Sequence, residues 1–231
     1  MGRGSIRRVR TSELNSWWTV VSAVANAAMR LVFRVRVEGE RNVPPLGSAI
    51  VAFNHVSVID GPAVGIVVAR KCGRRSRFLV AAEVFDKRLP GWILRSFDQI
   101  PIRRGQGDSH ALDEAIRTVK GGAIAALAPE GRVNDDGQSE MLRFHRGVAR
   151  LSLATGAPVV PVGLWGTQAR WPRSGRRYGK PWRPRLAFVF GEPVASHGNP
   201  TDPGDLAAFT QQVRAAIEVQ VAQARAITEA G

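Results

Sequence analysis

The sequence contains one cysteine, Cys72, among its 231 residues. A single thiol excludes an intramolecular disulfide and a zinc site built from several cysteines, and it fits a reducing compartment. The sequence also lacks a Walker A loop and a Gly-x-Ser-x-Gly motif. Gly105 and Gly107 do not form a dinucleotide-binding loop, because His110 stands where the third glycine is required. We therefore predict neither a metal site nor a bound cofactor.

Acidic residues are scarce relative to basic ones. The chain has 19 Asp and Glu against 33 Lys and Arg, which gives a formal net charge of +14. The imbalance is local, because no acidic residue falls between Met141 and Gly191, a stretch that holds ten basic residues. A positive field attracts polyanions, so an anionic membrane and nucleic acid are the two classes of partner that the charge favours.

An uninterrupted apolar run long enough to span a membrane is also missing. Such a helix needs about 20 mainly apolar residues, whereas the stretch from Trp17 to Phe33 carries a polar residue every three or four positions. These residues form a stripe on a predicted helix: Asn15, Thr19, Ser22, Asn26 and Arg30. A tail with four arginines precedes the helix, and two tryptophans lie at its start. We predict that residues 1–34 form a basic tail and an amphipathic helix in the headgroup region of a membrane. The alternative is a helix that packs on its own domain.

Residues 35–231 show apolar runs of strand length that alternate with segments of helical periodicity. The predicted strands are 35–37, 48–53, 78–82, 99–102, 123–128, 159–164 and 186–190. The predicted helices are 59–70, 108–120, 148–155 and a C-terminal helix that begins at Pro203. This alternation predicts one α/β domain with a mixed, largely parallel sheet flanked by helices. The stretch 170–184, rich in Arg, Pro and Gly, is predicted to be a long loop.

His55 directly follows the predicted strand 48–53, at the position where α/β proteins place ligand-binding residues. Asp60 comes five residues later, at the start of the next predicted helix. A carboxylate on one ring nitrogen fixes the tautomer of a histidine and leaves the other nitrogen free to accept a proton. The pair is therefore suited to make a hydroxyl nucleophilic. The alternative is a structural loop histidine beside an aspartate that caps its helix.

Three further segments accompany this pair in order along the chain. They are Ile100-Pro101-Ile102-Arg103-Arg104, Pro129-Glu130-Gly131, and Val160-Pro161-Val162 preceded by Phe144-His145-Arg146-Gly147. Together with Asn54-His55 and Asp60, they resemble the four motif blocks of the 1-acylglycerol-3-phosphate acyltransferases, which make phosphatidic acid from lysophosphatidic acid. The blocks span residues 48–167, about half of the chain. The resemblance implies that residues 35–231 form an acyltransferase domain with the glycerol-3-phosphate acyltransferase-like fold.

The resemblance also implies a mechanism. His55 is expected to act as the general base, supported by Asp60, while the acyl group moves from acyl-CoA or acyl carrier protein to a lysophospholipid acceptor. No metal or cofactor is expected to take part. The expected substrate-binding residues are Asn54, Arg104, Glu130, Gly131 and Arg132, with Arg104 on the acceptor phosphate. The enzyme is expected to serve phospholipid biosynthesis as a peripheral or monotopic protein on the cytoplasmic side of the cell membrane, with an anionic phospholipid membrane as partner and no nucleic acid.

The sequence departs from the family pattern at three places. Arg132-Val133-Asn134 stands where Thr-Arg-Ser is usual, Arg103 replaces a frequent Asp, and Asp98 stands where a small residue often precedes the second block. Because the second and third blocks hold the acceptor in this family, a lyso-ornithine lipid, another lyso-phospholipid or a glycolipid is an alternative acceptor.

Two basic stretches lie outside the motif blocks. The run from Arg70 to Arg77 is open to contacts with the membrane or with the phosphates of CoA. The stretch 170–184 interleaves basic and aromatic residues, which suits either insertion into a membrane interface or the binding of single-stranded nucleic acid. A basic nucleic-acid-binding protein is therefore the alternative function of a different class.

Overall fold

The computed structural model describes residues 14–103, 109–134 and 141–230. In these residues seven strands form a single sheet: β1 Arg34–Glu38, β2 Ala49–Phe53, β3 Ser76–Ala81, β4 Ile100–Ile102, β5 Ile124–Leu127, β6 Val159–Trp165 and β7 Arg185–Phe190. The helices are α1 Ser16–Val32, α2 Asp60–Val67, α3 Ala82–Phe85, α4 Arg88–Ser96, α5 Ser109–Lys120, α6 Gly147–Thr155 and α7 Pro203–Glu229. A π-helical turn, Val68–Cys72, extends α2, and short 3₁₀ turns lie at Glu40–Asn42 and Thr167–Ala169.

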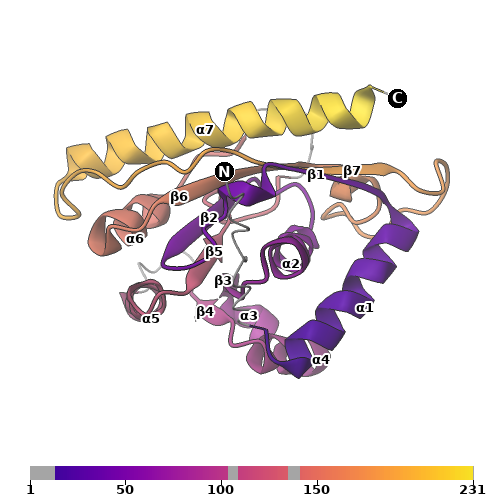
Figure 1. Ribbon diagram of the computed structural model, residues 1–231, viewed down its shortest axis with the longest axis horizontal. Helices are drawn as coiled ribbons and strands as arrows, with labels where there is room; N and C mark the ends of the chain where they lie inside the picture. Colours follow the sequence, from indigo (N-terminus) through magenta and orange to yellow (C-terminus); the bar gives the residue numbers. More distant parts are fainter. Residues whose placement is uncertain (1–13, 104–108, 135–140, 231) are drawn as a thin grey trace, which may run out of the picture.

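The strands follow the order β1-β7-β6-β2-β5-β3-β4. Strands β6, β2, β5, β3 and β4 are parallel, whereas β7 is antiparallel to β6 and pairs in parallel with β1. Figure 1 shows helices on both sides of the sheet, with the long helix α7 along one side and α1 and α2 on the other. The predicted fold class, a mixed and largely parallel sheet flanked by helices, is confirmed.

Strand β2 is buried along its whole length, because it lies in the interior of the sheet and helices cover both faces. Ala49, Val51 and Phe53 pack into the core that includes α1 and α2. Ile50 and Ala52 point to the other face and pack with residues of α5, α6 and α7. Apolar side chains thus hold β2 from both sides, and the residues that follow Phe53 start from a fixed position.

Helix α7 approaches the sheet closely at Gly163 of β6. A Cβ atom on this glycine would lie 2.1 Å from the backbone carbonyl carbon of Gln220 in α7. Only glycine therefore allows the helix and the strand to approach this closely. Asp202 caps the start of the helix by accepting a hydrogen bond from the N–H of Asp205, as the Asp202-Pro203 sequence predicts.

Helix α1 packs on the domain with one side and exposes apolar side chains on another. Trp18, Ser22 and Met29 are buried, so the predicted polar stripe faces in part towards the protein. The most exposed apolar side chains of the helix are 59%, 65% and 76% exposed: Val20, Val24 and Leu31. The packing is that of the alternative prediction, a helix that packs on its own domain. Contact of the apolar outer face with a membrane stays a prediction. Within the described residues, no helix combines the length and the apolar character needed to cross a membrane.

Helices α3 and α4 escape prediction from the sequence, because Pro90 and Gly91 interrupt the apolar periodicity of α4. Pro90 lies in the first turn of the helix, where proline is tolerated. Gly91 is required, since a Cβ atom there would lie 2.0 Å from the backbone oxygen of Phe85. Phe97, just after α4, packs edge-on against Trp18 of α1 with ring centroids 4.5 Å apart. The unpredicted helix therefore supports the start of α1.

Arg74 is a buried structural residue. Its side chain is 1% exposed, and the guanidinium donates hydrogen bonds to the backbone oxygens of Pro44 at 3.0 Å, Gly47 at 2.7 Å and Gly122 at 2.8 Å. These carbonyl groups lie in the turns before β2 and β5, so Arg74 connects the amino ends of two neighbouring strands. The expectation that the run from Arg70 to Arg77 contacts a membrane or CoA is wrong for Arg74, because burial removes its side chain from any ligand.

The substitution Arg74→Lys is expected to lower the free energy of unfolding by about 2–4 kcal/mol. An ammonium group lacks the forked geometry that reaches three carbonyl oxygens at once, and buried acceptors then lose their donors. Urea denaturation followed by circular dichroism measures the change. The exposed residue Arg70 provides the control, since Arg70→Lys should leave the unfolding midpoint unchanged. Equal stability of the two variants would contradict this role of Arg74.

Candidate active site

His55 and Asp60 meet in the loop that follows β2. Nδ1 of His55 lies 3.0 Å from Oδ2 of Asp60, and the same oxygen accepts hydrogen bonds from the N–H groups of Val56 and Ser57, both at 2.7 Å. The side chain of Asp60 is fully buried, whereas that of His55 is 16% exposed. Because Nδ1 is engaged with the carboxylate, Nε2 is the ring nitrogen available for proton transfer. The predicted pair is present in the structure.

The two strands beside β2 each bring one side chain to this loop. Thr167, just after β6, donates a hydrogen bond from Oγ1 to Oδ1 of Asp60 at 2.6 Å. Glu130, just after β5, accepts a hydrogen bond at Oε1 from the N–H of His55 at 2.7 Å. The three strands are parallel neighbours, so their carboxyl ends meet at one edge of the sheet. The His55–Asp60 pair is therefore supported from both sides.

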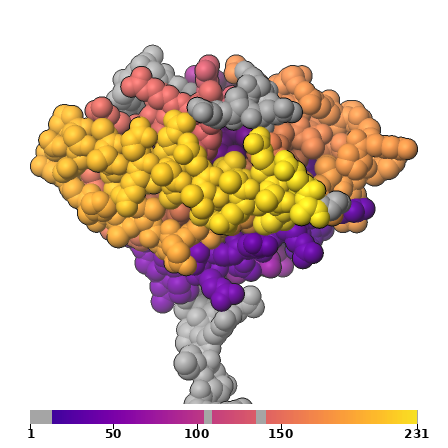
Figure 2. Space-filling model, turned by 90° about the horizontal axis from the view of Figure 1, so that it is seen from above, coloured from indigo at the N-terminus to yellow at the C-terminus, as the bar shows by residue number. Residues whose placement is uncertain are grey.

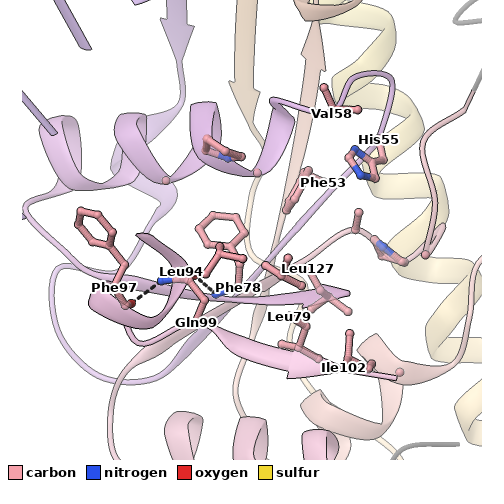
Figure 3. A pocket seen from close by; sticks show the side chains of 18 of the residues that line it. Phe53, His55, Val58, Phe78, Leu79, Leu94, Phe97, Gln99, Ile102 and Leu127 are labelled. Atoms are coloured by element: carbon pink, nitrogen blue, oxygen red, sulfur yellow. Dashed lines mark hydrogen bonds between the residues drawn. The ribbon is translucent and has the colours of Figure 1, made fainter. Parts of the chain in front are cut away.

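A cavity of about 890 Å³ opens beside His55. Apolar side chains from α1, α2, β3 and α4 line much of it, including Trp18, Val21, Ile66, Phe78, Leu94 and Phe97. Figure 3 shows His55 and Phe97 at opposite ends of the labelled lining. Three arginines also line the cavity: Arg103 after β4, Arg146 before α6, and Arg150 within α6. The cavity thus combines a long apolar part with basic groups, and its volume is in the range of ordinary ligand sites.

Glu130 lies beneath the loop of His55 and does not line the cavity. Its side chain is 3% exposed, and its second oxygen accepts a hydrogen bond from the N–H of Leu142 at 3.0 Å. Burial raises the pKa of the Glu130 carboxyl group, while the two backbone hydrogen bonds act in the opposite direction. Both carboxylate oxygens of Glu130 thus accept hydrogen bonds from backbone N–H groups. The bond from the N–H of His55 makes Glu130 a residue that positions His55. The sequence predicts the importance of Glu130 but associates it with the acceptor.

Asn54 continues the pairing of β2 with β6 beyond the end of the strand. Its Nδ2 donates to the backbone oxygen of Leu164 at 3.0 Å, and its Oδ1 accepts from the N–H of Leu164 at 2.8 Å. The side-chain amide therefore makes the two hydrogen bonds that a backbone residue would make. Asn54 is 1% exposed and fixes the start of the loop that carries His55. Like Glu130, it lies outside the cavity lining.

The other predicted substrate-binding residues lie at different places. Gly131 lines the cavity with φ at +69°, and a Cβ atom there would lie 2.9 Å from the ring of His145. The left-handed backbone favours glycine at this position, and a larger residue would also displace the exposed ring of His145. Arg132 is exposed and is not part of the cavity lining. Arg104, predicted to bind the acceptor phosphate, lies outside the described residues, and its neighbour Arg103 lines the cavity.

The sequence gives no role to Thr167 or Arg150, and Arg146 enters only as part of the segment Phe144-His145-Arg146-Gly147. Thr167 contacts Asp60 across 107 positions of sequence, and its only local signal is that a polar residue follows the apolar strand β6. Arg146 and Arg150 are one helical turn apart at the start of α6, so they face the same side. That spacing was the available signal, but ten basic residues in the same stretch concealed it.

In the part of the chain that the structure describes, no three His, Cys, Asp or Glu side chains gather as metal ligands would. The site offers an imidazole oriented by a carboxylate, an apolar cavity and guanidinium groups that bind anions. Such an arrangement can take up an amphiphilic anion and remove a proton from a hydroxyl group placed near Nε2 of His55.

Comparison with known proteins identifies similar sequences and a similar fold. Residues 34–165 match the sequence model of the family described as Acyltransferase. The chain is 30% identical to the lyso-ornithine lipid O-acyltransferase of Pseudomonas aeruginosa, over 80% of this chain and 62% of that protein. It is 27% identical to the chloroplastic 1-acyl-sn-glycerol-3-phosphate acyltransferase LPAT1 of Arabidopsis thaliana, over 58% of this chain and 37% of that protein. The chain therefore spans less than two thirds of the length of these relatives.

The fold is similar to a solved structure. The crystal structure of the 1-acyl-sn-glycerophosphate acyltransferase PlsC from Thermotoga maritima superposes with a TM-score of 0.66 and 26% sequence identity. The match covers 87% of this chain and 78% of that one. The similarity thus extends over most of the sheet and its helices.

The substitution Thr167→Val is expected to lower the free energy of unfolding by about 1–3 kcal/mol. Valine preserves the shape of threonine but leaves Oδ1 of the buried Asp60 without the hydroxyl donor. Thr167→Ser retains the hydroxyl and should retain most of the stability. Urea denaturation of both variants measures the difference, and equal losses would mean that the methyl group, not the hydrogen bond, matters.

Proposed function

The chain belongs to the acyltransferase family, and we propose that it transfers a fatty acyl group from acyl-CoA or acyl carrier protein to lysophosphatidic acid, giving phosphatidic acid. One observation carries the proposal: a histidine oriented by a buried carboxylate lines a cavity that is apolar over much of its wall and also contains arginines. An acceptor with an acyl chain, a phosphate and a free hydroxyl matches each of these three features.

The reaction uses His55 as a general base. Nε2 takes the proton from the acceptor hydroxyl while its oxygen attacks the carbonyl carbon of the thioester. The tetrahedral intermediate collapses with cleavage of the carbon–sulfur bond, and the imidazolium returns the proton to the leaving thiolate. Asp60 stabilises the imidazolium and holds the ring in place. Positioned proton transfer of this kind contributes about 10²–10⁴-fold to the rate, and the scheme requires no metal or cofactor.

The acceptor phosphate is bound by the arginines that line the cavity. Guanidinium groups form charge-assisted, forked hydrogen bonds with phosphate oxygens, and Arg103, Arg146 and Arg150 all line the cavity that contains His55. Helix α6 begins at Gly147, which also lines the cavity, and a Cβ atom on this glycine would meet no atom within 4 Å. An anion can therefore approach the positive end of the helix dipole at this point.

The enzyme works as a peripheral protein at the cytoplasmic face of the cell membrane, in phospholipid biosynthesis. The net charge of +14 and the apolar outer face of α1 support this location. Each basic residue near an anionic bilayer contributes about 1 kcal/mol to attraction. The acceptor and the product are both lipids, so a protein held at the surface meets its substrate there.

A second acceptor is favoured by one specific observation. The relative with 30% identity over 80% of this chain is named a lyso-ornithine lipid O-acyltransferase. A lyso-ornithine lipid carries an amino-acid headgroup and no phosphate, so the arginines of the cavity would have less to bind. Initial rates with the two acceptors, measured at equal concentration in the same detergent, discriminate between these candidates.

The substitution His55→Ala is expected to lower acceptor-dependent release of thiol from palmitoyl-CoA by at least about 100-fold, because the general base is lost. Purified protein with detergent-dispersed lysophosphatidic acid provides the assay, and a thiol reagent provides the signal. His110→Ala is the matched control, since His110 is exposed on α5. Full activity of the His55 variant would contradict the assignment of the base. A folded wild-type protein without activity towards any lyso-lipid would contradict the function itself.

The substitution Arg150→Ala is expected to raise the KM for lysophosphatidic acid about tenfold or more, because a charge-assisted hydrogen bond to the phosphate is lost. The value of kcat should change much less, since the base remains in place. Arg143→Ala is the control, because Arg143 is exposed and does not line the cavity. A rise in the KM for palmitoyl-CoA alone would assign this arginine to the donor instead.

A further inference from the structure

Two aromatic side chains project from the stretch 170–184, which we call the aromatic-basic loop. Trp182 is 83% exposed and Tyr178 is 82% exposed, more than any other large apolar side chain of the described residues. Figure 2 shows this orange part of the chain projecting beyond the end of α7 at one edge of the molecule. Aromatic rings left this far in water are unusual in a protein that buries its other tryptophans at least in part.

The charged residues of the loop have one sign. Five exposed basic residues belong to the loop: Arg173, Arg176, Arg177, Lys180 and Arg183. No acidic residue lies in the loop or anywhere between Met141 and Gly191. The loop therefore presents exposed aromatic rings within a cluster of positive charge, which suits a partner with an anionic surface and a less polar layer beneath it.

From this placement we propose that the aromatic-basic loop is a docking element for an anionic lipid bilayer, with Tyr178 and Trp182 inserted at the level of the headgroups. The inference rests on the proposed function in one respect, that the bilayer supplies the acceptor lipid. Binding of the bilayer itself does not require catalysis. It adds to the outer face of α1 a second contact point, provided by a segment about 150 positions away in sequence.

The neighbour of the loop distinguishes a bilayer from nucleic acid. Arg183 donates a hydrogen bond of 2.6 Å to the backbone oxygen of Arg30, in the last turn of α1. The next residue, Leu31, is 76% exposed, and Val24 two turns earlier is 65% exposed. Aliphatic side chains offer no ring on which the bases of a single strand can stack, whereas the acyl region of a bilayer accommodates them. A basic residue of the loop, next to Trp182 in the sequence, thus contacts the end of α1 that carries an exposed aliphatic side chain.

The loop is also connected to the residues that hold the candidate base. At its start, the backbone oxygen of Trp171 accepts a hydrogen bond from Oγ of Ser57, and Ser57 donates its N–H to Asp60. Arg170 donates to the backbone oxygens of Gly179, at 3.1 Å, and of Pro181, so the two sides of the loop are joined. A bilayer that holds the loop therefore also fixes the orientation of the cavity relative to the lipid surface.

Binding to lipid vesicles tests the proposal without reference to activity. The full chain is sedimented with vesicles of phosphatidylcholine and phosphatidylglycerol, and with vesicles of phosphatidylcholine alone. The double variant Tyr178→Ala, Trp182→Ala is compared with the wild type and with Trp182→Phe, which retains an aromatic ring. Thermal unfolding serves as the control for folding, since both side chains are exposed and their loss should not change stability.

The double variant should bind the anionic vesicles about tenfold more weakly, and Trp182→Phe should bind nearly as well as the wild type. Replacement of Lys180 by Gln should weaken binding about fivefold, and added salt should reduce the difference. Transfer to a short-chain lysophosphatidic acid below its micellar concentration should be unchanged in all three variants. These binding results support the proposal even if the wild type transfers no acyl group.

Two results would overturn the proposal. One is equal binding of the wild type and the double variant to the anionic vesicles. The other is release of the wild-type protein from vesicles by single-stranded DNA, together with loss of DNA binding in the double variant. That result would assign the aromatic-basic loop to a nucleic acid.

Discussion

The arrangement of the site depends on the burial of one carboxylate. Asp60 has no exposed surface, and a carboxylate removed from water is stable only where hydrogen-bond donors replace the solvent. Four donors do so: the ring of His55, the N–H groups of Val56 and Ser57, and the hydroxyl of Thr167. They come from the turn after β2 and from the end of β6, so all four are present only when these strands are paired. Formation of the sheet and assembly of the candidate base are therefore coupled.

The cavity extends from His55, at this edge of the sheet, to helices α1 and α4. Helix α1 faces the cavity on one side and the exterior on another. Trp18 and Val21 line the cavity, whereas Val20 and Val24 are exposed. A single layer of helix therefore separates the apolar part of the cavity from the exterior.

Much of the fold and the central pair follow from the sequence, because they rest on local patterns. Apolar runs of strand length predict the seven strands, and His55 and Asp60 are five residues apart, in the loop after β2 and at the first residue of α2. The orientation of Glu130 does not follow, since residue spacing cannot show whether a carboxylate faces a ligand or a backbone N–H. Thr167 and Arg150 are equally invisible, because the hydrogen bond of Thr167 to Asp60 and the place of Arg150 in the cavity lining depend on how distant segments pack. Helix α4 is concealed by Pro90 and Gly91, whose fit depends on tertiary packing.

Gly163 connects the packing of α7 on the sheet with the candidate site at the edge of the sheet. Helix α7 lies directly against β6 at this glycine, and the same strand ends two residues before Thr167, the residue that donates to Asp60. The height of α7 above the sheet therefore sets the path of β6 and, through it, the reach of the threonine hydroxyl. The packing of α7, a helix that lines no part of the cavity among the described residues, thus bears on the position of a hydrogen bond at the candidate base.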